Sequence, residues 1–93
     1  MIVRILHEGQ YDLEAGAMQQ LNDLDQQAFD AIAEGDEKRF HTLFESILNA
    51  VRTQGKPLAM DDLRPSELIL PAPDATLEEV RSLFAQEGLI QPS

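Results

Sequence analysis

The chain has 93 residues, of which 43% are hydrophobic, so it can form one small globular domain and is too hydrophobic to be disordered. Its 17 acidic residues outnumber 7 basic ones, and a net charge of −10 repels nucleic-acid phosphates and anionic lipid headgroups. We therefore expect neither nucleic-acid binding nor direct membrane insertion. The lack of cysteine excludes a disulfide scaffold and thiolate chemistry. The chain shows no signal peptide and no apolar run of membrane length, which predicts a cytoplasmic protein.

Two short strands are expected at the start of the chain. Residues 2–6 include four apolar side chains, at Ile2, Val3, Ile5 and Leu6. Because Glu8 and Gly9 follow them, the pattern is typical of a buried strand that enters a turn. Residues 10–12 can return as a second strand.

Two helices are predicted next, from about residue 13 to 33 and from about residue 37 to 53. Apolar side chains recur along the first at Leu13, Ala17, Leu21, Leu24, Ala28 and Ile32. They recur along the second at Phe40, Leu43, Phe44, Ile47, Leu48 and Val51. Gly35 supplies a left-handed stop and Asp36 a new N-cap, while Gly55 and Pro57 end the second helix. Because the connection is so short, the helices must form an antiparallel hairpin.

The last third of the chain predicts a short strand and a capped helix. Residues 68–70 lie between two prolines and suit an edge strand that pairs with Ile2–Leu6. Residues 61–63 can form one helical turn. Thr76 and Glu79 form a capping box, and the helix that follows has its apolar face at Leu77, Val80, Leu83 and Phe84. Gly88 ends it, with Leu89 as the hydrophobic contact. The expected fold is α+β: one domain over residues 1–93, in which a small β-sheet packs against the helical hairpin and a C-terminal helix in two layers.

No catalytic motif is present. The chain lacks a Gly-rich phosphate loop, a nucleophile elbow and a paired His-Cys arrangement, so we expect no enzyme and no cofactor. His7, Glu8 and Asp12 could be drawn together as metal ligands, but their spacing matches no metal motif and an ordinary turn is favoured. His41 lies at the margin of the second apolar stripe, where we expect a partly buried histidine with a hydrogen-bond partner.

Charge along the hairpin gives two further expectations. The first helix is acidic, whereas bases lie in or beside the second helix, at Lys38, Arg39, Arg52 and Lys56. We therefore expect opposite charges to face each other along the seam between the two helices. Asp25 falls inside the apolar arc of the first helix, so it must lie at the edge of the core or contact a basic side chain, with Arg4 or Arg52 as candidates.

Three segments carry a resemblance to a known family. They are residues 1–11 (MIVRILHEGQY), 65–71 (PSELILP) and 74–90 (DATLEEVRSLFAQEGLI). In this order, with a helical hairpin between them, they resemble the PspA-associated domain family, whose members are found beside phage-shock protein A. The chain departs from the expected pattern at His7, where we expect a small residue such as Gly. The resemblance implies a PspA-like coiled-coil partner that remodels membranes and a role in the envelope-stress response, and it implies no catalytic residues.

Two classes of function follow. The first is an interaction module that binds a PspA-like coiled coil, and the alternative is an acidic regulator, either a nucleic-acid mimic or an inhibitor that sequesters a basic protein. Two surfaces of the first helix could serve: an acidic back formed by Asp23, Asp30 and Glu34, and an apolar margin formed by Met18 and Phe29. Solubility alone explains the acidic back equally well. The sequence leaves homo-oligomerisation open.

Overall fold

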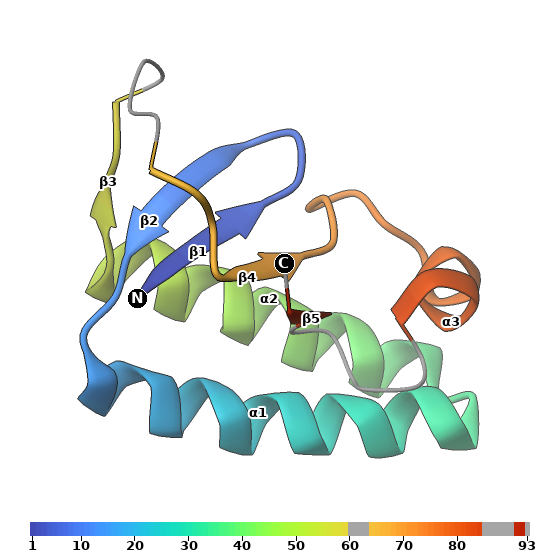
Figure 1. Ribbon diagram of the computed structural model, residues 1–93. Coiled ribbons are helices and arrows are strands. Elements are labelled where there is room, and N and C mark those ends of the chain that lie inside the picture. Colours follow the sequence, from blue (N-terminus) through green and yellow to red (C-terminus); the bar gives the residue numbers. More distant parts are fainter. Residues whose placement is uncertain (60–63, 85–90, 93) are drawn as a thin grey trace.

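The computed structural model has two layers, a small mixed sheet and a pair of long helices (Figure 1). In chain order its elements are β1 (Ile2–Ile5), β2 (Gly9–Asp12), α1 (Ala15–Glu34), α2 (Glu37–Gln54), β3 (Lys56–Pro57), β4 (Leu68–Leu70), α3 (Leu77–Phe84) and β5 (Gln91–Pro92). The structure describes residues 1–59, 64–84 and 91–92. The sheet lies over the antiparallel hairpin of α1 and α2, so the predicted α+β fold is confirmed.

The strand order is β3-β2-β1-β4-β5. β1 pairs antiparallel with β2 and parallel with β4, so Val3 lies between Tyr11 and Leu68. The predicted pairing of residues 68–70 with the first strand is confirmed, but their predicted edge position is wrong because β5 pairs along their other side. Each edge strand has two residues, one of which is Pro57 or Pro92, and this leaves little backbone free for a further strand.

The hydrophobic core lies between the sheet and the hairpin. Val3, Ile5 and Leu70 project into it from the central strands. The helices contribute the predicted stripes, whose fully buried members include Leu21, Ala28, Ile32, Phe40, Phe44, Ile47 and Val51. Phe40 and Phe44 stack with their ring centroids 5.5 Å apart. Since neither the sheet nor the hairpin can bury its apolar face alone, their packing against each other holds the domain together.

The two glycines that end the long helices do so for different reasons. Gly35 has a φ of 71°, the left-handed conformation predicted for the end of α1, and the Asp36 side chain then accepts a 3.1 Å hydrogen bond from the Arg39 N–H. Gly55 is extended, with a φ of −89°. A Cβ there would lie 2.7 Å from the Val51 carbonyl oxygen, so glycine is required for space rather than for backbone conformation.

The N-terminal cap of α3 is the predicted one. The Thr76 hydroxyl accepts a 3.2 Å hydrogen bond from the Glu79 N–H and donates to the Glu79 carboxylate at the same distance. The turn at residues 61–63, the side chains of Leu83 and Phe84, and the stop at Gly88 with its Leu89 contact lie outside the described residues.

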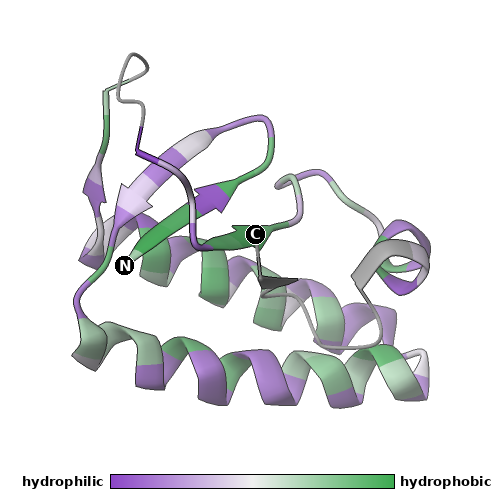
Figure 2. Cartoon of the chain, viewed as in Figure 1, coloured by the Kyte–Doolittle hydropathy of each residue, from purple (hydrophilic) through white to green (hydrophobic). Residues whose placement is uncertain are grey.

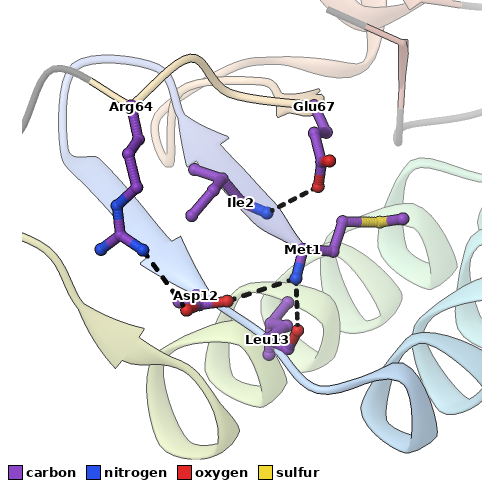
Figure 3. A network of polar contacts seen from close by, with 6 residues as sticks. All are labelled: Met1, Ile2, Asp12, Leu13, Arg64 and Glu67. Carbon is purple, nitrogen blue, oxygen red and sulfur yellow. Dashed lines mark hydrogen bonds and ion pairs between the residues drawn. The ribbon is translucent and has the colours of Figure 1, made fainter.

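Polar contacts tie the start of β1 to its neighbours on both sides (Figure 3). The Met1 amino group donates to Asp12 Oδ1 at 3.2 Å, and Arg64 lies 3.8 Å from the other oxygen of that carboxylate. On the other side, the Ile2 N–H donates to Glu67 Oε2 at 3.0 Å. These contacts fix the segment before β4 against the end of β2, which positions the β1–β2 hairpin.

Candidate functional site

A polar cluster at the turn of the β1–β2 hairpin joins the sheet to α2. Glu8 accepts hydrogen bonds from Arg52 on both carboxylate oxygens, with Arg52 Nε 2.9 Å from Oε2, and from the Tyr11 hydroxyl at 2.8 Å. Sequence reasoning identified Glu8 as a turn residue and considered it as a metal ligand, but did not find its contact with Arg52. Its partner lies on α2, far along the chain, and no periodicity or capping pattern marks such a pair.

The hydrogen bonds of this cluster shift the pKa values of its members. Hydrogen bonds from Arg52 lower the pKa of the Glu8 carboxyl below its usual 4.5, and the same contact raises the pKa of the Arg52 guanidinium. Burial, followed by the hydrogen bond to Glu8, raises the pKa of the Tyr11 phenol. Glu8 therefore stays ionised and hydrogen-bonded to Arg52 and Tyr11. This suits a residue that holds the hairpin turn against α2 and not a general acid.

The three residues considered as metal ligands serve separate purposes. Glu8 is occupied by Arg52 and Tyr11, and Asp12 lies between the Met1 amino group and Arg64. Among the described residues, no group of three His, Asp or Glu side chains could hold a metal ion.

His7 has a φ of 66°, in the left-handed region that side chains other than glycine rarely adopt. This conformation explains why a small residue is expected at the position, and the turn that it forms is closed by a 3.0 Å hydrogen bond from the Glu8 N–H to the Ile5 carbonyl.

The acidic back of α1 faces solvent. Asp23, Asp30 and Glu34 are all exposed, on the side opposite the buried stripe, and α1 carries no Lys, Arg or His. Figure 2 shows hydrophilic segments alternating with hydrophobic ones along α1. Glu34 lies 3.4 Å from Arg39. Within the described residues, Asp23 and Asp30 make no ion pair or hydrogen bond, so these two carboxylates present uncompensated negative charge.

The apolar margin of α1 is provided mainly by one residue. Phe29 is 37% exposed, whereas Met18 is half-buried and packs against the core. Asp25 is also half-buried, as expected at the edge of the core. Its predicted contact with Arg4 or Arg52 stays a prediction, and the Arg52 guanidinium binds Glu8.

Of two expectations about α2, one is wrong and the other is confirmed in part. His41 is exposed and not partly buried, although its ring lies against Phe40 with centroids 5.1 Å apart, because position 41 turns away from the centre of the apolar stripe. The expected charge pairing between the two helices is present at the closed end of the hairpin, where the Arg39 guanidinium of α2 lies 3.4 Å from the Glu34 carboxylate of α1. Arg52 turns to the sheet, and the contact that crosses the open end of the hairpin is the 2.8 Å hydrogen bond from Gln54 to Gln20.

Comparisons with known proteins agree with the resemblance seen in the three segments. In the described part of the chain, no helix combines the length and the apolar character needed to cross a membrane. Searches of curated proteins and of solved structures found no match. The family model described as PspA-Associated protein matches residues 1–92, nearly the whole chain. The chain therefore belongs to the PspA-associated protein family.

Proposed function

We propose that this protein is a non-catalytic interaction module that binds a PspA-like coiled-coil protein and thereby modulates an envelope-stress response in the cytoplasm. Membership of the PspA-associated family supports the choice of partner. The observation that carries the proposal is the acidic back of α1, a solvent-facing row of carboxylates on a helix without a single base.

The spacing of the acidic back suits a second helix. Asp23 and Asp30 are seven residues apart and Glu34 follows four residues later, so all three lie within about 40° on one side of α1 at 3.6 residues per turn. A coiled-coil protein repeats its outward positions every seven residues, and a basic residue in such a position would meet this row at matching intervals. The charges would accelerate encounter and set the register.

Affinity would come from apolar surface on the flank of α1, between the acidic back and the core. Phe29 is the exposed large hydrophobic residue of α1, and aromatic side chains that become desolvated dominate many interfaces. The two contributions separate experimentally, because charge acts mainly on the association rate and its salt dependence, while a buried aromatic acts on the dissociation rate.

A titration with charge-reversal variants tests the proposal. The purified PspA-like protein is titrated with the wild type and with the triple variant Asp23→Lys, Asp30→Lys, Glu34→Lys. The matched control reverses Glu45, Asp74 and Glu78, three exposed acids outside α1, and changes the net charge by the same amount. The proposal predicts binding at micromolar to tens of micromolar concentrations, lost in the first variant and kept in the control.

Other outcomes would point elsewhere. Equal loss of binding in both triple variants would mean that binding depends on the net charge of the protein and not on the acidic back of α1. No binding of the wild type to the coiled-coil protein, with binding to an unrelated basic protein, would favour the acidic regulator in place of the module.

A further inference from the structure

We draw no further inference here: the strongest candidate, the cleft beside the β1–β2 hairpin, carries none, because the Arg4 guanidinium and the ionised Glu8 carboxylate both line it, which favours neither an anion nor a cation, and nothing in the described part of the structure shows what covers it.

Discussion

Replacing Glu8 by Gln should destabilise the domain, because the variant keeps the shape of the side chain but loses the charge that Arg52 binds. The two side chains are 23% and 37% exposed, so solvent screens the pair and its contribution lies near the top of the range for exposed pairs, about 1 kcal/mol. For a domain of this size, that loss corresponds to a decrease in Tm of about 4–8 °C.

The pH dependence of this loss is the sharper test. Glu8 has a lowered pKa in the folded protein, so its contribution is complete above the usual value of 4.5 and is lost as pH falls through the folded value. Urea unfolding of wild type and Glu8→Gln should therefore differ by about 1 kcal/mol at neutral pH and converge in acid. The control, Asp23→Asn, alters an exposed carboxylate and should stay within about 0.5 kcal/mol of wild type. A deficit that persists unchanged in acid would refute the ion pair as its cause.

Four further predictions concern the fold. Gly55→Ala should lower the free energy of unfolding by about 1–3 kcal/mol because its Cβ meets the Val51 carbonyl. Gly16→Ala, at an open position in α1, should raise it by about 0.5–1 kcal/mol. Urea unfolding of both variants checks this contrast. Phe44→Ala should cost about 3–5 kcal/mol, and a nearly unchanged Tm would show that Phe44 is not core. His7→Gly should raise the free energy of unfolding by up to about 1 kcal/mol by relieving its positive φ, and a decrease would mean that the imidazole makes a stabilising contact. Thr76→Ala should lose about 1 kcal/mol with its capping hydrogen bond, and calorimetry showing no loss would mean that the cap is dispensable.

The features that the sequence predicts correctly are those with local causes. The apolar stripes of α1 and α2 follow from helical periodicity, and Gly35, Asp36 and Thr76 mark helix ends because their caps involve residues within a few positions. The strand at residues 68–70 follows from the short apolar run between prolines, whereas the parallel direction of its pairing with β1 is not predicted.

The features that sequence reasoning missed depend on contacts across the fold. Glu8 and Arg52 are 44 residues apart, and only the packing of the hairpin turn against α2 brings them together. The same packing places Tyr11 and Leu13 beside Gly55, so its requirement for space is invisible in the sequence. β5 is also hidden, because a strand of two residues has no periodicity. Within the candidate site, the exposure of Asp23 and Asp30 follows from the stripe, whereas the greater exposure of Phe29 relative to Met18 does not.

The contact between the acidic back of α1 and a PspA-like coiled coil is tested most directly by NMR cross-saturation. Deuterated, ¹⁵N-labelled protein is mixed with the unlabelled coiled-coil protein, the protons of the latter are saturated, and the loss of intensity is read at each amide. The proposed function predicts losses concentrated on the exposed side of α1, at Asp23, Asp30 and Glu34 and towards Phe29. Losses confined to the β1–β2 hairpin or to α3, or no losses at all at tens of micromolar, would contradict it.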